Sequence, residues 1–190
     1  MACGTAMIRA IIAWVFSLAL LGTAYASEDD PQVTVVVDTT ELTLAVMRGA
    51  EVLDVYDNIA IGSNGSTRSK LMGYEKTPLG QFTITEIRES KRFTVFLALD
   101  YPDLDHVQRA YAKGYIEADE FAGLKRAIDR GIAPPQNTPL GGHIGIHGIG
   151  AGDVEIHENF NWTNGCVALT NEQLQQLLAW VSPGTTVLIQ

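Results

Sequence analysis

A cysteine that directly follows a glycine is the side chain in this sequence best placed for nucleophilic chemistry. Cys166 comes after Gly165, in the segment Trp-Thr-Asn-Gly-Cys-Val-Ala-Leu-Thr-Asn at 162–171. A thiol attacks as its thiolate, and a free cysteine with a pKa of about 8.5 is only slightly ionised at neutral pH, so it needs a base. His147, nineteen residues upstream, is suited to take that proton and later give it to a departing amine. The pair therefore predicts acyl transfer.

The residues after Cys166 indicate how the chain holds the thiol. Gly165 gives the backbone of the turn before the cysteine its conformational freedom. Thr170 or Asn171 is a good N-cap for a helix whose apolar side chains recur as far as Val181. We expect this helix to begin a few residues after the cysteine, so that its free N–H groups and positive dipole end favour the thiolate. Backbone donors of the same turn could face a reacting carbonyl. The alternative is a buried, inert cysteine that packs as a small hydrophobe.

The segment Gly-His-Ile-Gly-Ile-His-Gly at 142–148 predicts a short strand, because its residue types alternate. On a strand, His143 and His147 stand about 13 Å apart along one face, too far to share a metal ion. The three glycines disfavour a helix, on which this spacing would suit zinc. We therefore expect no metal and no cofactor, with His143 lining a cleft beside His147. The remaining histidines, His106 and His157, are expected to be exposed to solvent.

A His-Gly strand end, a loop and Thr-Asn-Gly-Cys together resemble the L,D-transpeptidase (YkuD-type) catalytic domain. The pattern of that family is a histidine, a spacer of similar length and then Ser/Thr-x-Gly-Cys; here fifteen residues separate His147 from Thr163. The resemblance implies that Cys166 is the nucleophile. It also implies that His147 donates and accepts the proton, with the backbone carbonyl of Gly148 orienting its ring.

The resemblance further implies that the backbone N–H groups of Asn164, Gly165 and Cys166 stabilise the oxyanion, with Thr163 bordering the cleft. Two positions depart from the common motif: Asn164 stands where the family often has His, and Ala168 where it often has Arg. Both match a subgroup with Thr-Asn/Asp-Gly-Cys-Ile-Ala-Leu. Without that arginine another cation must hold the substrate carboxylate. The candidates are Arg68, Lys70, Lys76 and Arg92.

Residues 1–26 predict a secretory signal peptide. Arg9 supplies the positive region, 10–21 form an apolar run, and Ala-Tyr-Ala at 24–26 is a small-x-small cleavage site. The apolar run is short for a membrane span, so an uncleaved anchor is the less favoured alternative.

Cleavage after residue 26 would leave a polar leader at 27–31 and a catalytic domain at 32–190, exported to the periplasm without a membrane span. This length suits one domain with its own core. Loss of Cys3 leaves Cys166 as a single thiol, which in an oxidising compartment points to a reactive role. Loss of Arg9 reduces the 13 basic residues to 12 against 22 acidic ones. The resulting net charge of −10 argues against nucleic acid or an anionic membrane surface as partner.

Alternating apolar residues predict a domain dominated by strands. The stretches with this pattern are 33–37, 42–46, 51–56, 93–99 and 185–189. Thr-Pro-x-Gly at 77–80 is a second point of resemblance to the family and is typical of a turn, in which Pro78 presets φ and Gly80 permits a positive φ.

Helical spacing predicts two helices within 104–130, divided by Gly114 and ended by Gly131. They form either a lid over the site or a plain packing insertion. The expected fold class is mostly β with α: the mixed β-sandwich or barrel-like sheet of the L,D-transpeptidase catalytic domain, with this helical insertion.

The resemblance implies a periplasmic peptidoglycan L,D-transpeptidase. The thiol would attack the carbonyl of the L-centre of the diamino acid in a tetrapeptide stem and expel the terminal D-Ala. The acyl group would pass to an amine of another stem or of a wall-attached protein. One alternative is a carboxypeptidase or endopeptidase on the same scaffold; another is a non-catalytic wall-binding module, whose mark would be a lost Cys or His. Sortase-like transpeptidases need a later Arg, and none follows Cys166.

Overall fold

The computed structural model describes Met1 and residues 32–190. Beyond Met1, the predicted signal peptide and the polar leader at 27–31 lie outside the described residues. The strands are β1 (Val33–Asp38), β2 (Thr43–Arg48), β3 (Glu51–Tyr56), β4 (Ser66–Thr67), β5 (Thr77–Pro78), β6 (Gly80–Ser90), β7 (Thr94–Leu99), β8 (Gly145–Gly148), β9 (Val167–Leu169) and β10 (Thr186–Ile189). The helices are α1 (Leu104–Ala112), α2 (Ala118–Asp129), α3 (Val154–Asn159) and α4 (Asn171–Leu177).

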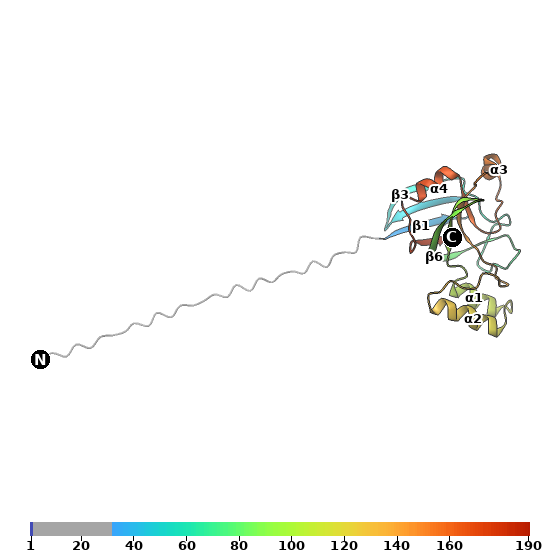
Figure 1. Ribbon diagram of the computed structural model, residues 1–190, viewed down its shortest axis with the longest axis horizontal. Coiled ribbons are helices and arrows are strands. Elements are labelled where there is room, and N and C mark those ends of the chain that lie inside the picture. Colours follow the sequence, from blue (N-terminus) through green and yellow to red (C-terminus); the bar gives the residue numbers. More distant parts are fainter. Residues whose placement is uncertain (2–31) are drawn as a thin grey trace.

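Eight of these strands form one sheet in the order β3-β2-β1-β10-β6-β7-β8-β9 (Figure 1). β1 runs parallel to β10, and β8 runs parallel to β9. The other neighbours in the sheet are antiparallel, and β4 and β5 form a separate parallel pair. The parallel pair β8 and β9 matters most here, because the two candidate catalytic residues lie on or beside it.

β6 joins the two halves of the sheet. Its residues 80–83 pair with β10, and residues 84–90 pair with β7. The register shifts between Ile84 and Glu86, close to this change of partner, and such a bulge bends and twists a strand. Beyond β3, Ala60 exchanges two backbone hydrogen bonds with Ala168 on β9, of 3.0 and 2.7 Å. The chain that leaves one edge of the sheet thus contacts the strand at the other edge, which gives the sheet its barrel-like closure.

The main core consists of apolar side chains from both halves of the sheet and from α4. Its largest fully buried members include Phe82, Leu44, Ile84, Leu97, Ile146, Leu169 and Leu174. These residues come from positions that alternate along the strands or recur at helical spacing, as an inward-facing set must. The predicted class, mostly β with a few helices, is confirmed.

The predicted helical insertion is present as α1 and α2. Gly114 and Gly131 follow the two helices with φ values of 69° and 64°, the left-handed conformation common where helices end. The helices pack around a second buried cluster, formed by Val107, Ala110, Ile116, Leu124 and Leu140. Figure 1 shows them together at one end of the molecule, away from α3 and α4.

Local structure near the candidate site differs from the prediction. The strand expected at 142–148 begins only at Gly145, because His143 has a φ of 55° that a strand does not allow. α4 begins at Asn171 with Thr170 as its N-cap in a capping box. The sequence did not predict β9 or α3, since three and six residues are too few to show a period.

The predicted exposure of His106 and His157 is wrong, and Gly80 does not use the positive φ that glycine permits. Gly80 is not among the residues with positive φ; an added Cβ would lie 3.2 Å from Asp103 Oδ2 and from the Phe82 ring. Close packing against these side chains therefore favours a glycine at this position. His106 and His157 are each only 3% exposed, because their rings pack against other aromatic rings.

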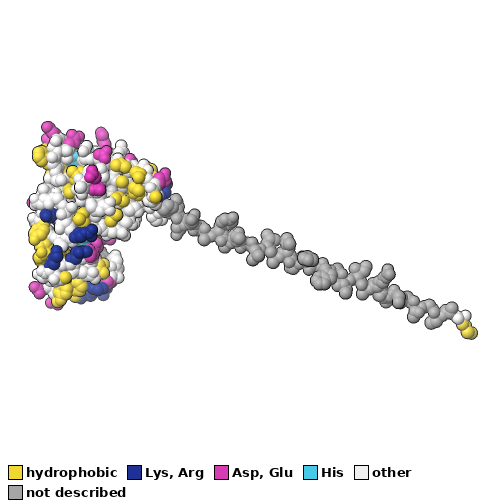
Figure 2. Space-filling model, turned by 180° about the vertical axis from the view of Figure 1, so that it is seen from behind, with side chains coloured by type: hydrophobic (Ala, Val, Ile, Leu, Met, Phe, Trp, Pro, Cys, Tyr) yellow, Lys and Arg dark blue, Asp and Glu magenta, His cyan; other side chains and the backbone are white. Residues whose placement is uncertain are grey.

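Charged side chains are spread unevenly over the surface. Figure 2 shows one face with Lys and Arg gathered in its middle and lower part and Asp and Glu mostly towards its edges. The net negative charge is therefore compatible with local basic regions. Within residues 32–190, no helix has the length and apolar character needed to cross a bilayer.

Candidate active site

The register of β8 and β9 brings Cys166 next to His147. Ile146 lies opposite Val167 and His147 opposite Ala168, so the cysteine sits one residue before β9, beside the start of β8. Both side chains line one cavity of about 350 Å³. Its other lining residues are Arg92, Phe93, Phe96, Gly142, His143, Ile144, Trp162, Thr163 and Asn164. None of them comes from α1 or α2, so the helical pair contributes no side chain to this cavity.

The sulfur of Cys166 lies against the backbone that leads into β8. The half-buried thiol donates a hydrogen bond to the carbonyl oxygen of His143 at 3.4 Å. Burial raises the pKa of the thiol to about 11, although the Gly145 N–H and the Lys70 charge act to lower it. The expected help from a helix N-terminus is absent, because β9 separates the cysteine from α4, which begins at Asn171. At neutral pH the resting side chain of Cys166 is therefore a protonated thiol.

The imidazole of His147 is buried, with only 2% of the residue exposed. Its Nδ1 lies 2.8 Å from the carbonyl oxygen of Gly148. Because a carbonyl can only accept, Nδ1 carries the proton of the neutral ring and Nε2 keeps a free lone pair. The pKa of His147 is lowered to about 4, mainly by burial and to a smaller extent by Arg92 and His157, while the hydrogen bond to Gly148 acts to raise it. The neutral ring is the form that can accept a proton from a thiol.

Aromatic rings enclose His147. Phe93 stacks on the imidazole with ring centroids 3.9 Å apart, and Phe96 lies 6.0 Å away in a parallel orientation. Trp162 meets it edge-on at 5.8 Å, and its Nε1–H donates to Nδ1 of His157 at 3.3 Å. Nothing in the sequence indicated a role for Phe93, since an aromatic residue at the start of a strand is usually a core residue.

The turn before Cys166 has its own hydrogen bonds. The Gly165 N–H donates to Thr163 Oγ1 at 3.1 Å, and that hydroxyl donates to the Cys166 carbonyl at 2.6 Å. Of the three predicted oxyanion donors, Gly165 is thus engaged within the turn. In the part of the chain that the structure describes, the N–H groups of Asn164 and Cys166 have no acceptor. These two donors remain free for a developing negative charge.

The four candidate cations are placed very differently. Arg92 is exposed, lines the cavity and lies over the Phe93 ring at 4.9 Å. Lys70 is buried, and its Nζ donates to the Asn164 carbonyl at 3.0 Å, so it is not free to meet a substrate carboxylate. Arg68 and Lys76 do not line the cavity. Arg92 is therefore the best placed of the four to hold a carboxylate.

The side chain of His143 is exposed and lines the cavity, but it stands before β8 rather than on it. Its backbone carbonyl, not its ring, contacts the thiol. Across residues 32–190, no three His, Cys, Asp or Glu side chains converge as metal ligands would.

This geometry agrees with a comparison against known families. The family model described as the YkuD L,D-transpeptidase catalytic domain matches residues 32–189. The chain belongs to the L,D-transpeptidase catalytic domain family.

Solved structures share the fold of this L,D-transpeptidase domain. The helical cell shape determining protein Pgp2 of Campylobacter jejuni matches with a TM-score of 0.56 and 20% identity, over 85% of this chain and 48% of that one. Bd1075 of Bdellovibrio bacteriovorus matches with a TM-score of 0.54 and 18% identity, over 87% and 50%. The chain thus spans about half the length of these structures. A search of curated proteins found no match.

Within the L,D-transpeptidase domain, the two departures from the common motif have a structural context. Ala168 is fully buried between His147 and Ala60, where a long charged side chain would have to be desolvated. Asn164 is exposed at the mouth of the cavity, so this position can vary. Why Asn rather than His occupies it has no explanation in the structure.

Proposed function

We propose that this domain catalyses cysteine acyl transfer on tetrapeptide stems of peptidoglycan in the periplasm. The observation that supports the reaction is the meeting, in one cavity, of the Cys166 thiol, a neutral His147 and two free backbone N–H groups. The substrate class rests on membership of the family, because the cavity alone does not name a peptide.

In the first step the proton of the Cys166 thiol moves to Nε2 of His147 as the sulfur attacks the substrate carbonyl. A carbon–sulfur bond forms, and the carbonyl oxygen becomes an oxyanion. The N–H groups of Asn164 and Cys166 donate to that oxygen. Donors that are already fixed in place stabilise the negative charge that develops there most strongly. Gly148 keeps Nδ1 protonated and the ring oriented throughout.

In the second step the carbon–nitrogen bond to the terminal D-Ala breaks. His147 returns its proton to the departing amine, which leaves a thioester on Cys166. Arg92 holds a substrate carboxylate at the cavity wall, so Arg92→Ala should raise the KM for the donor with little change in kcat.

The acyl group then passes to an acceptor. His147 removes a proton from the acceptor amine as it attacks the thioester, a new amide forms and the thiol is regenerated. An amine of another stem gives a cross-link, and an amine of a wall protein gives attachment. Water as acceptor would instead make the domain a carboxypeptidase or endopeptidase, and analysis of products from purified sacculi distinguishes these outcomes.

The decisive experiment is intact-mass spectrometry after incubation with a tetrapeptide stem donor. We expect an adduct equal to the donor less D-Ala, present in the wild type and absent in Cys166→Ala. Binding of the donor without any adduct would favour the wall-binding alternative. A thiol that iodoacetamide labels only after denaturation would contradict the assignment of Cys166 as nucleophile.

A further inference from the structure

A buried lysine lies behind the turn that carries the nucleophile. Lys70, in the loop between β4 and β5, is only 3% exposed. Its Nζ donates to the Asn164 carbonyl at 3.0 Å, across 94 residues of sequence. A Cβ added to Gly165 would lie 2.9 Å from that Nζ and 2.6 Å from the Lys76 carbonyl oxygen. The glycine that precedes the cysteine is thus required partly because the ammonium group packs against it.

Among the described residues, this ammonium has no fixed counter-charge. No carboxylate of residues 32–190 lies within ion-pair distance of Lys70. Burial lowers the pKa of Lys70, and negative charge at Cys166 and at Glu75 opposes that effect. Glu75 is exposed and accepts a hydrogen bond from Ser63. A buried charge destabilises the fold unless it is paired, so the burial of Lys70 calls for a compensating interaction. In the proposed reaction, Cys166 is the nearby group that gains negative charge.

The contact also fixes the direction of a peptide group. The Asn164 carbonyl and the Gly165 N–H belong to one planar unit, so they point in opposite directions. Holding the oxygen at Lys70 turns the N–H to Thr163 Oγ1, where the structure has it. The N–H groups of Asn164 and Cys166, on either side of this peptide group, are left without acceptors among the described residues.

We propose that Lys70 is a positioning residue that anchors the nucleophile turn through the Asn164 carbonyl and, with its buried positive charge, stabilises the thiolate of Cys166. The proposal rests on the proposed function, in which the Cys166 sulfur gains negative charge as it gives up its proton and attacks. The other charged or titratable side chains that line the cavity around the sulfur are His147 on β8, His143 just before β8 and Arg92 before β7; the His143 side chain is exposed. His147 is neutral above pH 4, and Arg92 is exposed to solvent and salt. Lys70 is the buried cation of the set.

The test measures the rate at which iodoacetamide labels Cys166 in the native protein at pH 8, by intact mass. Below the thiol pKa this rate follows the thiolate fraction. Loss of an opposite charge should raise the thiol pKa by about one pH unit or more. Labelling of Lys70→Met should therefore slow roughly three- to tenfold, the lower value allowing for the greater nucleophilicity of a less acidic thiol.

Three further variants isolate the charge. Lys70→Gln keeps a donor for the Asn164 carbonyl without the charge and should slow labelling as Met does, whereas Lys70→Arg should label close to the wild-type rate. Arg68→Met removes the same charge from an exposed position of the same loop and should leave the rate unchanged.

Thermal unfolding distinguishes this role from a structural one. Removing a buried, unpaired charge should leave the melting temperature of Lys70→Met unchanged or higher. A lower melting temperature together with wild-type labelling of both Lys70→Met and Lys70→Gln would overturn the proposal, and would leave the proposed function intact. A wild-type thiol that does not react at all in the native state would instead count against the proposed function, and with it against the role of Lys70.

Discussion

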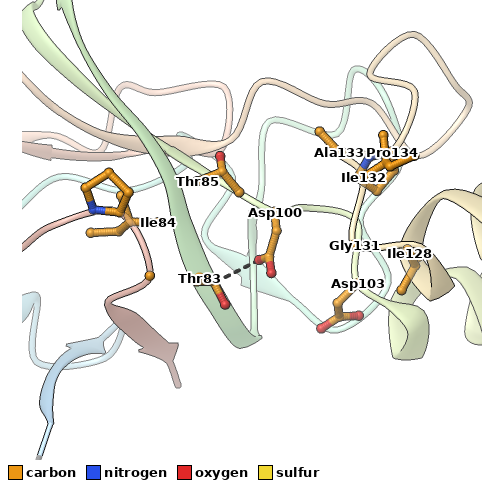
Figure 3. A pocket seen from close by; sticks show the side chains of 12 residues that line it. Thr83, Ile84, Thr85, Asp100, Asp103, Ile128, Gly131, Ile132, Ala133 and Pro134 are labelled. Atoms are coloured by element: carbon orange, nitrogen blue, oxygen red, sulfur yellow. Dashed lines mark hydrogen bonds between the residues drawn. The ribbon is translucent and has the colours of Figure 1, made fainter.

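Two cavities of this domain differ in size and in chemistry, and the larger is not the one that Cys166 and His147 line. The larger, of about 480 Å³, lies between β6 and the end of α2 and holds two carboxylates (Figure 3). Both are already engaged: Asp100 accepts a hydrogen bond from the Thr83 N–H at 2.8 Å. Asp103 accepts one from the His106 N–H at 2.8 Å, and Nδ1 of that histidine lies 2.7 Å away.

The smaller cavity differs in what it leaves unsatisfied. The Cys166 thiol, Nε2 of His147 and the Asn164 and Cys166 N–H groups are all available to a substrate. If the proposed function is correct, activity in this domain depends on free donors, acceptors and a nucleophile rather than on the volume of a cavity. Substitutions in the two cavities should therefore separate activity from stability.

The largest effect should come from the nucleophile and the base. Cys166→Ala should abolish the acyl-enzyme, and His147→Ala should slow its formation by about 10²- to 10⁴-fold. The double mutant should be no worse than the more damaged single one, because the residues act as a unit. His143→Ala is the control. Adduct formation at the wild-type rate in His147→Ala, with none in His143→Ala, would place the base on the other histidine.

The neutral state of the pair predicts a characteristic pH profile. His147, with a pKa lowered to about 4, can act as a base above that pH, and the thiol stays protonated until its pKa of about 11. Acylation should therefore be nearly flat through neutral pH and fall about tenfold per pH unit below 4. The measurement is kcat/KM against pH, with circular dichroism to check the fold. A bell centred near neutral pH would instead indicate a thiolate–imidazolium pair.

Phe93→Ala should have a smaller effect on the same cavity. Its ring covers the imidazole at 3.9 Å, so its loss admits water and moves the pKa of His147 up towards its ordinary value. Acylation at pH 5 should fall by roughly threefold to tenfold, and the acid limb of the profile should shift to higher pH. An unshifted limb would mean that burial by Phe93 does not set the pKa.

Asp103→Ala should change stability and leave the acylation rate unchanged. The carboxylate caps α1 and contacts the buried His106 ring, so its loss should cost about 1 to 2 kcal/mol of unfolding free energy. Asp105→Ala, which removes an exposed ion pair with Arg109, is the matched control and should change the unfolding free energy very little. Chemical denaturation measures the unfolding free energy of both variants. A large loss of acylation in Asp103→Ala would instead mean that the larger cavity contributes to the activity of the smaller one.

The sequence determined the elements whose signals are local. Alternating residues marked β1, β2 and β3, helical spacing and two glycines marked α1 and α2, and Thr170 marked the start of α4. The order His, spacer, Thr-Asn-Gly-Cys was by itself sufficient to indicate Cys166 and His147 as the candidate catalytic pair.

Tertiary structure decided the surroundings of that pair. The stacking of Phe93 on His147, the bond from Lys70 to Asn164 and the burial of His106 and His157 join residues far apart in the chain, and no period or spacing encodes them. The protonation state was decided in the same way. A short strand, β9, separates Cys166 from the helix that was expected to lower its pKa, and burial raises that pKa instead. The local sequence pattern indicates which face of a helix or strand is apolar. The desolvation of a titratable side chain depends instead on which distant parts of the chain pack over it in the folded structure.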